Sequence, residues 1–273
     1  MKRDRIKVCV FRVGGTNCDM ETKIAFEELG VNAEIVHFKK IAMNKGLLEN
    51  YHVLVFPGGF SYGDYVRAGA IWGKEVMSRM LDELTKFIES MRPIVGICNG
   101  FQVLIESGIL PGFENDDETL GVSLMTNDSM RYECRWVYLK HVNAGRCKLT
   151  RLIPKNKILK IPVAHNEGKF IISRERFEEI SKLLLDNDQV VFTYVKPDGG
   201  KANGQYPYNP NGSDLDIAAI CSFRGNVLGM MPHPERAFFG WQLPDWTRYE
   251  KLPQYGDGKL IFESIVGYLE EEF

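Results

Sequence analysis

The sequence has 273 residues, of which 44% are hydrophobic and 26% charged, a composition that excludes a disordered or collagen-like chain. Its 34 basic and 36 acidic residues leave a net charge of −2, so no overall charge favours nucleic acid or an anionic membrane as a partner. No apolar run approaches the ~20 residues that cross a bilayer, and the start of the chain is typical of a strand rather than of a secretory signal. We therefore expect a folded cytoplasmic protein.

Six cysteines are scattered along the chain, at positions 9, 18, 98, 134, 147 and 221. None belongs to a Cys-x-x-Cys pair and the five histidines are not clustered, so the sequence predicts no metal site. A disulfide framework is not expected in a reducing cytoplasm either. The question is then whether one of these thiols is chemically special.

Strand-like and helix-like segments alternate in the first hundred residues. Short runs rich in Val and Ile predict strands at 7–13, 33–37, 53–56 and 94–97. Helical spacing predicts helices at 19–29 and 71–91, the second of which ends before Pro93. Continuous apolar strands separated by helices are typical of a parallel sheet covered on both faces. Such a sheet carries its chemistry in loops at the carboxyl ends of its strands.

The second half is less regular. Further strands are predicted at 135–140, 157–163, 189–194, 217–222 and 227–231, and helices at 175–186 and 259–270. The last two strands flank Phe223-Arg224-Gly225-Asn226, a hairpin turn by composition, while 112–132 and 196–213 are predicted connections. Because no linker or repeat divides the chain, we expect one α/β domain over 1–273. It has an open, mostly parallel sheet with helices on both faces, antiparallel additions, and an elaborated loop at 237–258.

The strongest local signal is the segment Gly96-Ile97-Cys98-Asn99-Gly100, which follows a buried strand and opens a helix. The same pattern with serine is the nucleophile elbow of hydrolases, where glycines permit a very sharp turn. The N–H groups and dipole at the start of a helix favour a thiolate, which is the reactive form of cysteine. This context favours a catalytic Cys98 over a buried structural one.

A cysteine nucleophile needs a base and a group that orients the base. Two of the histidines have a glutamate two residues later, His165 with Glu167 and His233 with Glu235. In an extended chain the two members of such a pair point to the same face. Pro234 favours an extended His233, so the second pair is the better candidate, although the first remains open.

A third element is the pair Gly58-Gly59, which follows the predicted strand 53–56. Backbone N–H groups left bare at the end of a strand suit a developing oxyanion. By contrast, Gly14-Gly15 after the first strand lacks the full Gly-x-Gly-x-x-Gly pattern, so dinucleotide binding is not favoured.

These elements, in this order, resemble the class I (triad) glutamine amidotransferases, and within them the glutaminase subunits of phosphoribosylformylglycinamidine synthases. The segments that carry the resemblance are 58–69 (GGFSYGDYVRAG), 96–102 (GICNGFQ), 134–137 (CRWV) and 225–236 (GNVLGMMPHPER). The resemblance implies a flavodoxin-like fold and a triad of Cys98, His233 and Glu235. It further implies that the backbone N–H groups of Gly59 and Asn99 hold the oxyanion. The remaining implied glutamine-binding residues are Gly58, Phe60 and Gln102.

The resemblance also implies a role in a larger complex. The chain would hydrolyse the side-chain amide of glutamine and deliver ammonia to a large synthetase subunit, with a small bridging subunit in the same complex. The synthetase would convert formylglycinamide ribonucleotide to formylglycinamidine ribonucleotide in purine biosynthesis. ATP and Mg²⁺ would belong to that partner, since this chain has no Walker-type phosphate loop and no cofactor of its own.

Other functions stay open at this point. The chain could serve another synthetase, or act alone as a cysteine hydrolase of γ-glutamyl bonds. A non-catalytic interaction subunit is an alternative of a different class. Labelling of Cys98 by an electrophilic glutamine analogue would separate the enzymes from the interaction subunit.

Overall fold

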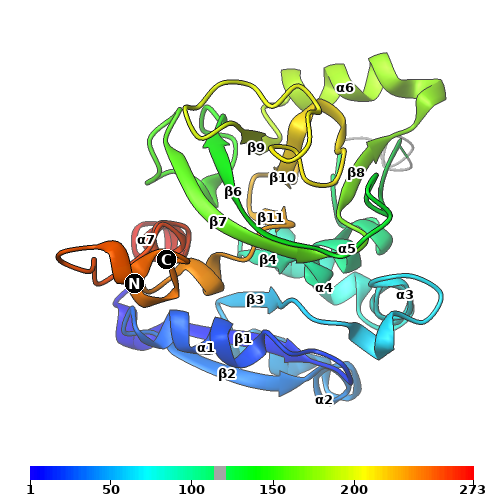
Figure 1. Ribbon diagram of the computed structural model, residues 1–273. Helices are drawn as coiled ribbons and strands as arrows, with labels where there is room; N and C mark the ends of the chain where they lie inside the picture. The colour runs from blue at the N-terminus through cyan, green and yellow to red at the C-terminus, as the bar shows by residue number, and fades with distance from the viewer. Residues whose placement is uncertain (114–120) are drawn as a thin grey trace.

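A computed structural model describes residues 1–113 and 121–273 (Figure 1). Its strands are β1 (Lys7–Arg12), β2 (Asn32–His37), β3 (Val53–Phe56), β4 (Ile94–Ile97), β5 (Val122–Met125), β6 (Glu133–His141), β7 (Ile158–His165), β8 (Lys169–Ile172), β9 (Val190–Val195), β10 (Ile217–Cys221) and β11 (Val227–Met230). Its α-helices are α1 (Asp19–Glu27), α2 (Phe38–Met43), α3 (Ala70–Arg79), α4 (Leu81–Glu89), α5 (Asn99–Glu106), α6 (Phe177–Asp186) and α7 (Gly258–Glu272).

Within the described residues, nine strands form one sheet in the order β2-β1-β3-β4-β11-β10-β9-β6-β7, and β5 pairs separately with β8. The strands from β2 to β11 pair in parallel, and those from β11 to β7 are antiparallel. The predicted fold class, a mostly parallel sheet with antiparallel additions in the second half, is therefore confirmed. The boundary between the halves is the predicted hairpin of β10 and β11.

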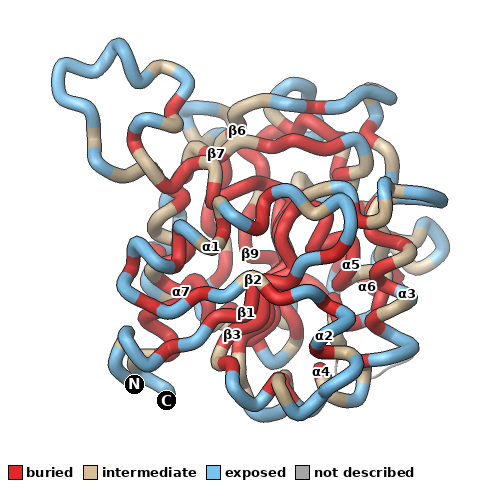
Figure 2. The backbone as a smooth tube through the Cα atoms, turned by 90° about the horizontal axis from the view of Figure 1, so that it is seen from below, coloured by how far each residue is buried: buried red, intermediate tan, exposed pale blue. Residues whose placement is uncertain are grey.

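The parallel strands form the centre of the core. Every residue of β3, β4 and β11 is buried, because helices cover both faces of this part of the sheet. Figure 2 shows α1 and α7 on one side of β1 and β3, and α3, α4 and α5 on the other. None of the helices described combines the length and apolar composition needed to span a lipid bilayer.

The region predicted as one helix over 71–91 is two helices, α3 and α4. The chain leaves the helical conformation at Met80, where φ is −132° and ψ is −3°. Trp72, Val76, Met80 and Leu84 are nevertheless all buried at a constant spacing of four. The apolar pattern continues through the break, so periodicity alone does not reveal it.

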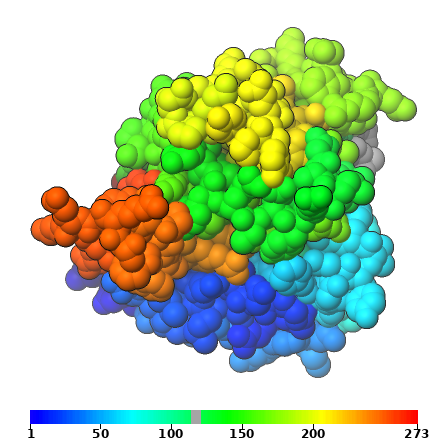
Figure 3. Space-filling view, viewed as in Figure 1, coloured from blue at the N-terminus to red at the C-terminus, as the bar shows by residue number. Residues whose placement is uncertain are grey.

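Several short strands and one short helix were also not predicted from the sequence. The predicted connection 112–132 contains β5, which pairs with β8, and 38–43 forms α2; the acidic residues 116–118 lie outside the described residues. These elements have only four to six residues, too few for a period to be read, and unlike the equally short β3 and β4 they mix polar with apolar residues. Residues 237–258, the predicted elaborated loop, contain short 3₁₀ turns and project from one side of the molecule, in orange in Figure 3.

Candidate active site

Cys98 stands at a sharp turn between β4 and α5. Its backbone has φ 51° and ψ −107°, a conformation that non-glycine residues rarely adopt. A Cβ added at Gly100 would lie 1.8 Å from the Phe56 carbonyl oxygen, so only glycine allows α5 to start this close to β3. The Cys98 N–H donates to the Met230 carbonyl at 2.7 Å and ties the elbow to the end of β11. This is the elbow that the sequence predicts.

The Cys98 thiol lies at a small cavity. Its side chain is buried, and its Sγ is 3.5 Å from the Ala164 carbonyl oxygen near the end of β7. The cavity has a volume of about 130 Å³ and is lined by Gly59, Phe60, Asp64, Ala68, Cys98, Gln102, Ala164, His165, Asn166 and Glu167. The loops after β3 and β7 therefore face the nucleophile across a space suited to a small molecule.

His233 and Glu235 form a buried pair beside this cavity. His233 Nδ1 and Glu235 Oε1 are 2.5 Å apart, and each residue is only 1% exposed. The predicted strand ends earlier than expected, at Met230, and Pro234 begins a 3₁₀ turn. The imidazole and carboxylate thus meet across a tight turn rather than along an extended strand. The backbone N–H of His233 donates to the Pro162 carbonyl at 2.8 Å, which fixes this turn against β7.

The surroundings of His233 favour its charged form. Burial alone lowers the pKa of its imidazole, but the interactions with Glu235 and with Cys98 raise it well above the usual value. His233 Nε2 has no hydrogen-bond partner among the described residues, although it is buried. With Nδ1 held by Glu235, the free Nε2 is the atom available to exchange a proton at Cys98.

In the other candidate pair, the side chains of His165 and Glu167 bond to different partners. His165 Nδ1 donates to Asn127 Oδ1 at 3.1 Å, and Asn211 Nδ2 lies 3.5 Å from His165 Nε2. Burial lowers the pKa of His165 to about 3, so the ring is neutral. Glu167 instead accepts from the Ala68 N–H at 3.1 Å through Oε2. These contacts leave Glu167 unable to orient His165 as Glu235 orients His233.

The backbone beside Cys98 offers two unused donors. Gly59 pairs with Thr16 in an isolated antiparallel bridge, whose hydrogen bonds are donated by the N–H groups of Asn17 and Phe60. Among the described residues no partner is found for the N–H of Gly59 or of Asn99. A Cβ at Gly59 would lie 2.7 Å from the Asn17 nitrogen, so glycine is needed here. The two free N–H groups have the character of an oxyanion hole.

The side chains of Asn99 and Gln102 tie the cavity walls together. Asn99 Nδ2 donates to Gln102 Oε1 at 3.0 Å and to Asp64 Oδ1 at 3.3 Å. Gln102 Nε2 donates to the Glu167 carbonyl at 2.6 Å. Gln102 therefore lines the cavity while its amide holds the loop after β7.

Gly58 and Phe60 lie on opposite sides of Gly59. A Cβ at Gly58 would come within 2.8 Å of His233 Cε1, so Gly58 makes room for the imidazole. Phe60 is 41% exposed, lines the cavity and stacks on Tyr132 at a centroid distance of 6.3 Å.

One residue that the sequence did not indicate as part of the site, Cys18, also contacts His233. Cys18 Sγ lies 4.0 Å from His233 Nδ1 and accepts from Arg236 Nη2 at 3.0 Å. Burial raises the pKa of the Cys18 thiol to about 11, so it is a neutral neighbour of the imidazole. Cys18, His233 and Glu235 are the only buried group of metal-ligand type found among the described residues. Three of their potential ligand atoms, His233 Nδ1, Glu235 Oε1 and Cys18 Sγ, are already engaged with one another or with Arg236.

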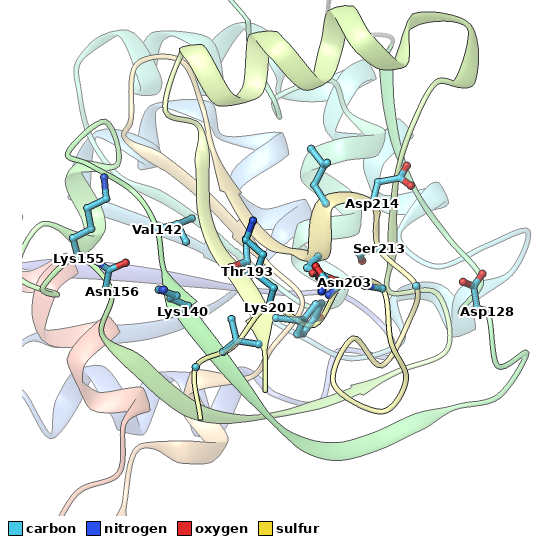
Figure 4. A pocket seen from close by; sticks show the side chains of 17 residues that line it. Asp128, Lys140, Val142, Lys155, Asn156, Thr193, Lys201, Asn203, Ser213 and Asp214 are labelled. Carbon is cyan, nitrogen blue, oxygen red and sulfur yellow. Dashed lines mark hydrogen bonds between the residues drawn. The ribbon is translucent and has the colours of Figure 1, made fainter. Parts of the chain in front are cut away.

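A wider cavity of about 670 Å³ lies on the antiparallel half (Figure 4). Lys140 on β6, Thr193 on β9 and Lys201 in the following loop line it. None of the predicted catalytic residues does so, which leaves the smaller cavity at Cys98 as the candidate site.

Comparison with known proteins identifies the family of this chain. Residues 5–269 match the model of the CobB/CobQ-like glutamine amidotransferase domain. The chain is 46% identical to the phosphoribosylformylglycinamidine synthase subunit PurQ of Archaeoglobus fulgidus, over 99% of this chain and 100% of the relative. It is 41% identical to PurQ of Methanothrix thermoacetophila, over 97% and 99% of the two chains.

A solved structure, that of PurLQS from Thermotoga maritima, contains a chain with 32% identity and a TM-score of 0.72. The match covers 97% of this chain and 99% of that one. The chain therefore belongs to the CobB/CobQ-like glutamine amidotransferases, in the family of the PurQ subunits of phosphoribosylformylglycinamidine synthase.

Proposed function

We propose that this chain is the glutaminase subunit of a phosphoribosylformylglycinamidine synthase and that Cys98, His233 and Glu235 carry its reaction. Cys98 Sγ attacks the side-chain amide carbon of glutamine, and the tetrahedral oxyanion accepts hydrogen bonds from the N–H groups of Gly59 and Asn99. The carbon–nitrogen bond then breaks, leaving a γ-glutamyl thioester and ammonia. Water hydrolyses the thioester to glutamate and the free thiol, so glutamine and water yield glutamate and ammonia.

His233 moves the protons in both halves of the reaction. Charged by the proton that Cys98 gives up, its Nε2 protonates the departing nitrogen and then takes a proton from the attacking water. Glu235 keeps Nδ1 protonated and stabilises the imidazolium. The observation that carries this proposal is the buried His233–Glu235 pair at 2.5 Å. It leaves His233 Nε2 without a partner among the described residues, and Glu235 and Cys98 raise the pKa of the imidazole.

The partner follows from the chemistry of ammonia, which is a nucleophile only while it is unprotonated. In neutral water most of the ammonia would be protonated to ammonium, which does not react as a nucleophile. A synthetase that receives the ammonia directly is therefore needed. The Thermotoga maritima relative was solved as part of PurLQS. We propose that this chain likewise assembles with a large synthetase subunit, which holds ATP and Mg²⁺, and with a small bridging subunit.

We make two further proposals, on the domain organisation and on the cellular location. The family match over 5–269 supports a single glutamine amidotransferase domain over 1–273, with 237–258 as its surface elaboration. A cytoplasmic location is proposed because purine nucleotides are built from soluble phosphorylated intermediates. Fractionation of cells followed by detection of the chain tests the location.

The Cys98→Ala variant tests the nucleophile. In the assembled complex it should abolish synthesis driven by glutamine but spare synthesis driven by an added ammonium salt, because the synthetase site is untouched. Both rates are measured as formation of formylglycinamidine ribonucleotide. Cys134→Ala is the matched control, since Cys134 is exposed on β6 and outside the cavity. A Cys98→Ala complex that still used glutamine would rule out the proposed mechanism.

A further inference from the structure

The cavity of about 670 Å³ on the antiparallel half, hereafter the wide cavity, has no part in the proposed reaction. It is lined by strands β6 and β9, by the turn just before β7 and by parts of the loop between β9 and β10. Its volume lies in the range of pockets that hold small metabolites and far exceeds that of a single small ion. A preformed space of this size is a candidate binding site in its own right.

Three lysines from separate segments line the wide cavity. Lys140 lies on β6 opposite Thr193 of β9, and Lys201 pairs with Val195 on the other side of β9. Lys155 lies in the turn before β7. None of the three lysines forms an ion pair or a side-chain hydrogen bond with the described part of the chain. Their positive charges are therefore available to a ligand.

Two of the three aspartates that line the wide cavity are neutralised by cations from outside it. Asp128 Oδ1 lies 2.5 Å from Lys169 Nζ, and Asp214 Oδ1 lies 3.0 Å from Arg174 Nη2. Both of these cations lie outside the cavity lining. In Figure 4 the two aspartates are well separated from Lys155. They therefore do not balance the charge of the lysines.

The third aspartate, Asp216, is held by hydrogen bonds instead of by a cation. Its carboxylate accepts from the backbone N–H groups of Asn203 at 2.7 Å and Gly204 at 2.8 Å, and from Asn209 Nδ2 at 2.8 Å. With three unpaired lysines and one such carboxylate, the wide cavity carries a net positive charge. Positive charge on a concave surface raises the local concentration of anions, so we expect an anionic ligand.

The rest of the lining suits an uncharged ring system attached to the anion. Val142, Val195 and Leu215 supply apolar surface. The side-chain amides of Asn156 and Asn203 form no hydrogen bond within the described ranges 1–113 and 121–273. Leu215 is 42% exposed at φ 52°, a backbone conformation that is uncommon for a residue of its type. Strained positions of this kind cluster where a structure holds a ligand.

We propose that the wide cavity binds a nucleoside phosphate. Its phosphate groups lie at Lys140, Lys155 and Lys201, and its sugar and base lie against the apolar and amide groups. Several ammonium groups match a phosphate ester, which carries close to two negative charges at neutral pH. No described residue lines both this cavity and the one at Cys98, so the inference does not depend on the proposed reaction.

Binding of AMP, ADP and GMP to the full chain, measured by isothermal titration calorimetry, tests the proposal. At least one nucleotide should bind saturably, and more tightly than inorganic phosphate or adenosine, since only a nucleotide fills both parts of the cavity. Lys140→Gln and Lys201→Gln should each weaken that binding about 10-fold, because each removes a charge-assisted contact. Lys157→Gln is the matched control, since Lys157 is exposed beside the turn but outside the cavity lining.

Acetylation of lysines by acetic anhydride, followed by mass spectrometry, locates the bound nucleotide. Lys140, Lys155 and Lys201 should be protected, whereas Lys157 should react at the same rate with and without the nucleotide. The proposal is overturned if none of the three nucleotides binds, or if inorganic phosphate or adenosine binds as tightly as they do. Equal weakening by Lys157→Gln and the cavity variants, or protection confined to other lysines, would also overturn it.

Discussion

The two His-x-Glu segments of this chain have the same residue types at the same spacing and opposite environments. His233 is paired with its own glutamate, and its pKa is raised well above the usual value. His165 bonds to Asn127, its pKa is lowered to about 3 by burial, and its glutamate faces another loop. A sequence motif therefore specifies which groups are available, whereas the partners supplied by the fold decide whether they act as a charged pair.

The largest expected difference between the two pairs is in catalysis. His233→Ala should lower the rate of glutamine hydrolysis by at least about 100-fold, because the proton donor and acceptor is lost. His165→Ala should leave formation of the γ-glutamyl thioester largely intact in the molecules that fold. Trapping the thioester after rapid acid quench measures both. If the thioester were lost in His165→Ala but not in His233→Ala, the base would be His165 and the assignment to His233 would be wrong.

A glycine packs against each imidazole, which allows a matched comparison with a single methyl group. A Cβ at Gly58 would lie 2.8 Å from the His233 ring, and one at Gly168 would lie 2.4 Å from the His165 ring. Gly58→Ala should reduce glutamine hydrolysis about 10- to 100-fold by displacing the base. Gly168→Ala should lower the free energy of unfolding by about 1–3 kcal/mol, since the extra atom overpacks a buried site.

Steady-state kinetics and urea unfolding of both variants distinguish these effects. Equal losses of activity and of stability in the two variants would show that the imidazoles do not differ in role.

The smallest expected effect is on the pH dependence of stability. His165 stays neutral in the folded protein to about pH 3 but takes up a proton near pH 6.5 when unfolded, so its contribution to stability is full above pH 6.5 and falls as the pH drops towards 3. His233 acts in the opposite sense, because its folded pKa is raised. Its contribution is present below pH 6.5 and is lost as the pH rises through the folded value.

His165→Gln should therefore have a shallower loss of stability between pH 6.5 and pH 5, by on the order of 1–2 kcal/mol. Urea unfolding at the two pH values measures this slope. An unchanged slope would mean that His165 is not neutral in the folded protein.

Local sequence patterns are enough to predict the central strands of the parallel half of the sheet. The strands predicted at 53–56 and 94–97 coincide with β3 and β4, because neither run contains a polar residue and a proline marks one end of each, Pro57 after β3 and Pro93 before β4. The elbow at Cys98 could be predicted for the same reason, since its glycines are required by a close approach of helix and strand. The break at Met80 could not, because the apolar spacing runs through it.

The sequence did not indicate that Asp64 and Glu167 line one cavity. Asp64 lies in the segment 58–69 and Glu167 in the first His-x-Glu pair, about one hundred residues apart, and no local pattern connects the two. Cys18 escaped notice as a neighbour of His233 for the same reason.

What the sequence by itself determines is the chemistry available: a thiol at a sharp turn, two histidines with acidic neighbours, and bare glycine N–H groups at the end of a strand. Which groups meet is decided by the tertiary structure. Pairing of β4 with β11 brings Cys98 and His233 to one sheet edge, since neighbouring parallel strands end together. The antiparallel half then curves so that the end of β7 reaches the sulfur (Figure 1). Such long-range pairing depends on the register of whole strands, and no short segment of sequence encodes it.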